Sequence, residues 1–194
     1  MDERHLKDLL KDVQTGAVSV DDALDKLRVL PYEDLGFARV DHHRALRQGF
    51  PEVVYCPGKT PDQVAQIMAR LAARNPRVLA SRADTDTYVA VRAELPDAVY
   101  HERARLIVLN GEPDAEKRPG VVVISAGTSD IPVAEEAALT AELMGNAVER
   151  LYDVGVAGIH RLFPSLRRMI DEDVDVIIAI AGREGAMASV VAGV

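Results

Sequence analysis

Three clusters of glycine and polar residues follow three strand-like runs in the last third of the chain. Their residue types suit the binding of an anionic ligand. Backbone N–H groups in glycine-rich turns, together with the positive end of a following helix, bind phosphate oxygens. The pattern therefore predicts a site for a ligand that carries phosphate or carboxylate groups. The clusters are Gly127-Thr128-Ser129-Asp130, Gly158-Ile159-His160-Arg161 and Gly182-Arg183-Glu184-Gly185-Ala186.

The side chains of these clusters offer complementary chemistry. Ser129 can donate a hydroxyl hydrogen bond, and Asp130 can accept one from a ribose hydroxyl or take up a proton. The imidazole of His160 suits proton transfer at neutral pH, and Arg161 can hold a carboxylate or phosphate through two hydrogen bonds. Glu184, expected in the first turn of a helix, is a candidate general base. We therefore treat His160, Glu184 and Asp130 as candidate catalytic residues.

Each of these residues also has a purely structural interpretation, which the sequence leaves open. Gly127 and Gly158 are typical of sharp turns, and Asp130 is a typical N-cap residue. His160 can form a solvated pair with the arginine that follows it. A glutamate at the position of Glu184 is favoured in the first turn of any helix.

The elements around the clusters predict a parallel α/β sheet. Each strand-like run is short enough for a buried strand, and an alanine-rich helix over 134–143 follows the first run. Ligands bind outside the carboxyl ends of the strands of such a sheet, so the three clusters are expected to converge on one crevice. The expected strands are Val121–Ser125, Ala147–Tyr152 and Val174–Ile180.

The rest of the chain predicts three further parts. Residues 1–34 read as a helical arm of two short amphipathic helices, 35–110 as a small α/β domain, and 111–119 as a charged, turn-rich linker to the domain at 120–194. In the small domain we expect a helix that begins at Pro61 with Thr60 as its cap. The other expected elements are strands at Phe37–Val40, Glu52–Tyr55, Arg77–Ser81 and Ala104–Leu109 and a helix at Asp86–Leu95.

His42 and His43 are the other residues that suggest chemistry, because histidine is a common metal ligand. Adjacent residues of an extended segment point to opposite sides, and no second group of ligands occurs nearby in the sequence. We therefore predict no metal site here and favour a surface or interdomain role for both histidines.

Composition excludes several classes of protein. The chain has 194 residues and a formal net charge of −8, which argues against a nucleic-acid-binding surface. Its one cysteine, Cys56, cannot form an intramolecular disulfide and is typical of a reducing compartment. The first residues are charged and contain no apolar signal core. The run Val174–Ala181 is too short to cross a bilayer. We expect a cytoplasmic protein with no membrane partner.

The clusters resemble a known family. Gly127-Thr128-Ser129-Asp130, Gly158-Ile159-His160-Arg161 and Ile177–Gly182 are similar to the aminoimidazole ribonucleotide carboxylase (PurE) fold and, more closely, to its LarB relatives in nickel-pincer cofactor biosynthesis. Leu35–Arg44, Gly49–Val53 and Gly58–Pro61 resemble the region that LarB proteins carry before their PurE-like domain. Together these segments extend over residues 35–194.

The resemblance implies a fold and an activity. The fold would be a flavodoxin-like (PurE-like) parallel sheet with helices on both faces. The activity would be carboxylation of the pyridinium ring of nicotinic acid adenine dinucleotide with hydrolysis of its phosphoanhydride, giving AMP and pyridinium-3,5-biscarboxylic acid mononucleotide. CO2 or bicarbonate would be the co-substrate. No tightly bound cofactor is implied, Mg²⁺ is compatible with the reaction, and a homo-octamer like that of PurE is expected.

Two departures keep other functions open. The purine enzymes carry a second histidine in the third cluster, where this chain has Arg183-Glu184. LarB-type enzymes use a cysteine that the family places beyond the third cluster, so Cys56 is not matched to that role. A flavodoxin-like sheet normally has five strands, and residues 120–194 provide only three. This also suggests a chain that is truncated after Val194. The alternatives are a PurE-type aminoimidazole ribonucleotide carboxylase or mutase and a non-catalytic nucleotide-binding module.

Overall fold

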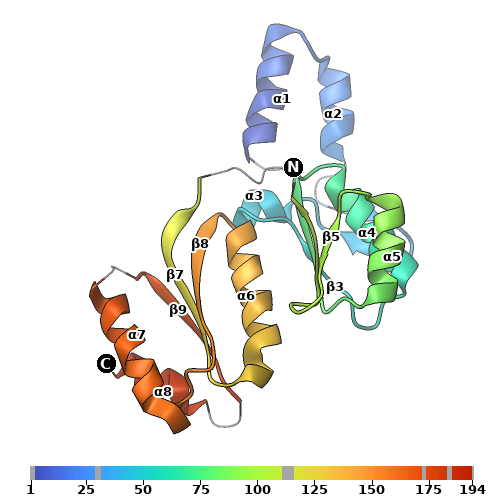
Figure 1. The fold of residues 1–194 in the computed structure, drawn as a ribbon. Coiled ribbons are helices and arrows are strands. Elements are labelled where there is room, and N and C mark those ends of the chain that lie inside the picture. Colours follow the sequence, from blue (N-terminus) through green and yellow to red (C-terminus); the bar gives the residue numbers. More distant parts are fainter. Residues whose placement is uncertain (1–2, 29–31, 111–115, 172–173, 183–184, 194) are drawn as a thin grey trace. The chain divides into compact units, whose positions relative to one another are not determined.

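The computed structural model describes residues 3–28, 32–110, 116–171, 174–182 and 185–193 (Figure 1). It divides into two compact units. The first contains Met1–Tyr100 and Ile107–Glu112, and the second contains His101–Leu106 and Pro113–Val194. The domain boundaries given above stay a prediction. Each unit is described by itself below.

Two amphipathic helices begin the first unit, as expected. They are α1 (Glu3–Thr15) and α2 (Val20–Arg28). The helices pack against each other, and Leu9 and Ala23 are buried. Ser19 accepts a hydrogen bond from the backbone N–H of Asp22, as an N-cap residue does. Among the described residues, no helix is long and apolar enough to span a bilayer.

The rest of the first unit contains a four-stranded mixed sheet in the order β3-β4-β6-β5. Strands β3 and β4 are parallel, whereas β6 runs antiparallel to β4. Helices α4 and α5 contribute apolar side chains to the core, among them Val64, Met68, Leu71 and Val91. The elements are β3 (Val53–Tyr55), α4 (Pro61–Ala72), β4 (Arg77–Ser81), α5 (Thr85–Glu94), β5 (Val99–His101) and β6 (Leu106–Asn110).

Helix α4 begins where the sequence places it. Thr60 Oγ1 accepts a hydrogen bond from the backbone N–H of Gln63 at 3.2 Å, and the Gln63 side chain accepts one from the backbone N–H of Thr60 at 3.0 Å. These two bonds form a capping box, and Pro61 occupies the first helical turn, where its missing N–H has no cost.

A small hairpin and a short helix precede this sheet. Strands β1 (Glu33–Asp34) and β2 (Arg39–Val40) pair antiparallel, and α3 spans Arg44–Gln48. The expected strand Phe37–Val40 is therefore shorter than predicted. Gly36 has a φ of +82°, and its N–H donates to Asp34 Oδ1 at 2.8 Å, so the chain turns just before Phe37.

The expected surface or interdomain role of His42 is wrong, because this side chain is buried within the first unit. His42 Nε2 lies 3.0 Å from Glu33 Oε2. Its Nδ1 is buried and has no hydrogen-bond partner in the described part of the chain. Burial lowers the pKa of His42 below its ordinary value of 6.5, although the hydrogen bond to Glu33 acts in the opposite direction.

The buried His42 predicts a loss of stability in mild acid. The unfolded chain takes up a proton on this imidazole near pH 6.5, whereas the folded chain resists protonation until a lower pH. The free energy of unfolding should therefore be highest above pH 6.5 and fall as the pH decreases toward the lowered pKa. Denaturant unfolding at pH 7.5, 6.5 and 5.5 tests this. His42→Gln should flatten that slope, and exposed His160→Asn should leave it unchanged.

The second unit is a parallel sheet with helices on both faces. Its described strands follow the order β8-β7-β9, which is the 2-1-3 order of a flavodoxin-like fold. Helix α6 covers one face through Ala134 and Ala138, and α7 and α8 cover the other through residues such as Leu162 and Met187. The elements are β7 (Arg118–Ser125), α6 (Ile131–Leu143), β8 (Asn146–Leu151), α7 (Ile159–Asp171), β9 (Val176–Ile180) and α8 (Ala186–Ala192).

Candidate functional site

The carboxyl ends of β7, β8 and β9 lie at one end of the second unit, where α6, α7 and α8 begin (Figure 1). The chain passes from β7 to α6 on one face of the sheet and from β9 to α8 on the other. This divergence between neighbouring strands is the topological switch point at which open α/β sheets form a ligand crevice. The three polar clusters are therefore at the expected end of the sheet.

The first cluster forms a short 3-10 helix between β7 and α6. This turn spans Thr128–Asp130, and Ser129 in it is exposed. Asp130 Oδ2 accepts a hydrogen bond from the backbone N–H of Gly127 at 2.9 Å. The Asp130 side chain does not cap α6. It closes the turn instead, and no second partner for this carboxylate occurs among the described residues.

The second cluster begins α7. Gly158 ends a 3-10 turn over Val156–Gly158, and His160 and Arg161 follow in the first turn of the helix. Both side chains are exposed. His160 has no hydrogen-bond partner in the described ranges. Arg161 Nη1 donates to Asp153 Oδ2 at 2.5 Å, so the guanidinium is held over its own loop.

The third cluster is described only in part. Arg183 and Glu184 lie outside the described residues, so their predicted roles stay predictions. Gly185 has a φ of +66° and donates its N–H to the carbonyl of Gly182 at 3.2 Å, after which Ala186 begins α8. Helix α8 lies against the 3-10 turn over Val156–Gly158, which brings the second and third clusters together.

Backbone hydrogen bonds join the three loops. The N–H of Val154 donates to the carbonyl of Ser125 at 3.0 Å, and the N–H of Gly155 donates to the carbonyl of Ala126 at 2.9 Å. The N–H of Ala126 in turn donates to the carbonyl of Ile180 at the end of β9. The segment just before the first cluster is thus bonded to the loop after β8 and to the end of β9, so the three clusters begin close to one another.

Asp153 is the residue of this loop that the sequence did not suggest. It has a φ of +60°, a left-handed conformation that is uncommon outside glycine and best tolerated by aspartate and asparagine. Its N–H lies 3.4 Å from Ser125 Oγ, and its carboxylate accepts from Arg161. An aspartate that closely follows the second strand-like run was the available signal, but neither its conformation nor its partner is visible in residue types.

The glycines of the second loop have different surroundings. A Cβ on Gly155 would lie 2.6 Å from the carbonyl oxygen of Ala126, which is backbone and cannot easily move. A Cβ on Gly158 would lie 2.6 Å from Arg161 Nε, at the end of a flexible side chain. Gly155 is therefore required by the fold, whereas Gly158 makes room for the guanidinium.

This difference predicts separate effects for two matched substitutions. Gly155→Ala should lower the free energy of unfolding by about 1–3 kcal/mol, because overpacking against backbone forces the chain to shift. Gly158→Ala should change it by less than about 1 kcal/mol and instead displace Arg161, weakening the binding of an anionic ligand. Denaturant unfolding and ligand titration on both variants check this. The same loss of stability in both variants would contradict it.

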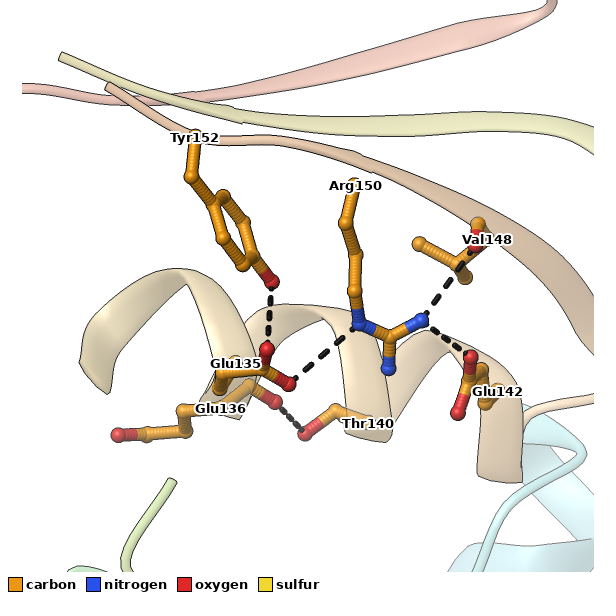
Figure 2. A network of polar contacts seen from close by, with 7 residues as sticks. All are labelled: Glu135, Glu136, Thr140, Glu142, Val148, Arg150 and Tyr152. Carbon is orange, nitrogen blue, oxygen red and sulfur yellow. Dashed lines mark hydrogen bonds and ion pairs between the residues drawn. The ribbon is translucent and has the colours of Figure 1, made fainter. Parts of the chain in front are cut away.

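A polar network fastens β8 to α6 beside this loop (Figure 2). Val148 and Arg150 of β8, and Tyr152 directly after the strand, lie on the face that α6 covers. Arg150 Nη1 donates to Glu142 Oε1 at 2.6 Å, and Tyr152 Oη donates to Glu135 Oε1 at 2.9 Å. The network ends at Tyr152, directly before Asp153.

The network is electrostatically stable at neutral pH. The hydrogen bond to Glu142 raises the pKa of the Arg150 guanidinium above its usual range. Burial, and then the hydrogen bond to Glu135, raises the pKa of Tyr152 to about 12. Arg150 is therefore charged and Tyr152 is a neutral donor at any physiological pH, so the end of β8 stays fixed to α6.

Two other residues that could in principle take part in catalysis, Cys56 and Asp41, make contacts that stabilise the fold. Cys56 is buried in the apolar core of the first unit, where its thiol faces the carbonyl of Val54 at 4.0 Å. Asp41 accepts from Arg47 at 2.7 Å, and this hydrogen bond lowers the pKa of the Asp41 carboxyl. Across the described ranges, no group of three or more histidine, cysteine, aspartate or glutamate residues is placed to hold a metal ion.

Comparison with known proteins agrees with this architecture. Residues 32–112 match the family model of the LarB/PurE-like N-terminal domain. The chain is also 40% identical over 196 residues to uncharacterized protein MJ0165 of Methanocaldococcus jannaschii, a match that covers 97% of this chain and 77% of that protein. With this degree of identity over almost its whole length, and with a flavodoxin-like sheet after the matched domain, the chain belongs to the carboxylase-related LarB/PurE-like family.

Proposed function

We propose that this protein is a LarB-type carboxylase and hydrolase that acts on nicotinic acid adenine dinucleotide. It would add a carboxylate to the pyridinium ring and cleave the phosphoanhydride, with AMP and pyridinium-3,5-biscarboxylic acid mononucleotide as products. The observation that carries the proposal is Arg161, held by Asp153 at the carboxyl end of the sheet, with the rest of its guanidinium unpartnered among the described residues. Membership of the LarB/PurE-like family supports a carboxylase-type reaction.

The first cluster supports a ligand that approaches the backbone closely. Gly127 has an extended conformation with a φ of −133°, which any residue adopts. A Cβ at this position would only reach ordinary contact distance, 3.6 Å from Asp130 Oδ2. The fold itself therefore does not require glycine at residue 127. A bound phosphate or ribose lying against this backbone explains the glycine, and Thr128 and Ser129 then offer hydroxyl donors.

The reaction needs groups that the three loops supply. Carboxylation replaces a ring proton by a carboxylate, so a base must take up that proton, and His160 and Glu184 are the proposed candidates. Asp130 has one oxygen that is not bound to Gly127 and can accept from a ribose hydroxyl. Cleavage of the phosphoanhydride consumes water and leaves charge on phosphate oxygens, which Arg161 is suited to stabilise.

An assay with two substrates tests the proposal. The full-length protein should release AMP and the biscarboxylated mononucleotide from nicotinic acid adenine dinucleotide and bicarbonate, as detected by chromatography and mass spectrometry. Consumption of aminoimidazole ribonucleotide instead would move the protein to the purine carboxylases or mutases. Tight binding of the dinucleotide without turnover would indicate a nucleotide-binding module. Either result would overturn the proposal. His160→Asn serves as the control for contaminating hydrolases.

A further inference from the structure

The conformation of Asp153 points to a role beyond fold stability. This residue follows Tyr152, which is bonded to Glu135, and adopts a left-handed conformation with a φ of +60°. Its carboxylate and the Arg161 guanidinium form an ion pair across eight residues, and their side chains are 47% and 42% exposed. Ion pairs with this exposure contribute little to stability. A strained backbone that persists to form such a pair is typical of a functional site.

The geometry of the pair leaves the arginine available to a ligand. Asp153 binds Nη1 alone. Nε and Nη2 pack over Gly158, where a Cβ would lie 2.6 and 2.8 Å from them. Neither nitrogen has a hydrogen-bond partner among the described residues. The Arg161 guanidinium, bound by Asp153 at Nη1, therefore keeps Nε and Nη2 as donors for an anionic group. Asp153 sets the orientation of the guanidinium before the ligand binds.

The support for Asp153 extends to the opposite face of the sheet. Tyr152 donates a hydrogen bond to Glu135 of α6 (Figure 2). The N–H of Asp153 lies 3.4 Å from Ser125 Oγ at the end of β7. Ser125 is completely buried. The backbone at Asp153 is thus held next to a bonded side chain and a buried hydroxyl, and its carboxylate is placed to bind Arg161.

We infer that Asp153 is a positioning residue that orients Arg161 to bind a phosphate or carboxylate of the substrate. The inference rests on the proposed function, because it takes the ligand to be an anionic dinucleotide. It predicts that the effect of Asp153 on ligand affinity passes through Arg161. A residue that only stabilised the loop would affect affinity whether or not Arg161 were present.

A double-mutant cycle tests this. Asp153→Gly removes the carboxylate while relieving the left-handed backbone, and should weaken binding of nicotinic acid adenine dinucleotide about five- to tenfold. Asp153→Asn tolerates the same backbone and keeps an acceptor for Arg161, so it should recover part of that loss. In the Arg161→Ala background, Asp153→Gly should change the dissociation constant less than about twofold, because the residue through which it acts is gone.

The outcomes separate this inference from the proposed function. Wild-type affinity in Asp153→Gly, a gain of affinity, or an equal loss in the Arg161→Ala background would each overturn the positioning role. Wild-type affinity in Arg161→Ala alone would instead overturn the assignment of Arg161 to the site. If Asp153→Gly does not fold, as judged by circular dichroism, the same cycle with Asp153→Asn decides the question. Inorganic pyrophosphate serves as a second probe. Its affinity should be highest for the wild-type protein, lower for Asp153→Asn and lower again for Asp153→Gly.

Discussion

Replacing His160 by asparagine is expected to lower turnover of nicotinic acid adenine dinucleotide by about 10²–10⁴-fold, the usual contribution of a positioned acid or base. Affinity for the dinucleotide should change only a few-fold, because a proton is moved in the transition state and not on binding. The fold should be unaffected, since His160 is exposed and makes no hydrogen bond within the described part of the chain.

Two comparisons make this result specific. His101→Asn places the same change in β5 of the other sheet and should leave turnover unchanged. Glu184→Gln tests the competing candidate for the general base. If Glu184→Gln abolishes turnover while His160→Asn retains the wild-type rate, the histidine has no part in proton transfer and the second loop only binds. Steady-state kinetics and titration of the dinucleotide, both on purified protein, separate the two effects.

The sequence predicted the parts of the fold that rest on long apolar patterns or strong caps. The strand Arg77–Ser81 has the predicted limits, because four of its five residues are buried and arginine and serine flank the apolar run. Helix α4 begins at Pro61 because Thr60 and Pro61 are local signals. The parallel strands of the second unit follow from three strand-like runs, each leading to a turn that contains glycine.

Short elements and non-local contacts could not be predicted. The strand β1 contains only Glu33 and Asp34, and α3 has five mostly polar residues, so neither shows a periodicity. The burial of His42 was not predicted, because its hydrogen-bond partner Glu33 lies nine residues away and residue types do not show that contact. Asp153 was missed for the same reason. Its ion pair with Arg161 spans eight residues and depends on a backbone conformation that no residue pattern reveals.

The second large effect is expected from Arg161→Ala, which should weaken binding of the dinucleotide by about 1.5–3 kcal/mol, or roughly ten- to hundredfold, the range for hydrogen bonds to charged groups. Arg161→Lys should recover only part of the loss, because an ammonium group cannot reproduce the two-donor edge of a guanidinium. Isothermal titration measures both. Arg167→Ala is the matched control, since it removes the same charge from an exposed position of the same helix.

The two halves of the substrate can then show which group Arg161 binds. If it binds the phosphate of the nicotinate half, Arg161→Ala should lose affinity for nicotinic acid mononucleotide and retain that for AMP. If it binds the adenylate phosphate, the order should be reversed. Raising the salt concentration should lower the affinity of the wild-type protein for the dinucleotide more than that of Arg161→Ala, because salt screens the partly exposed charge of Arg161. Unchanged affinity for both halves and for the intact dinucleotide would mean that the loop after β8 faces away from the ligand. The assignment of the second cluster to the site would then be wrong.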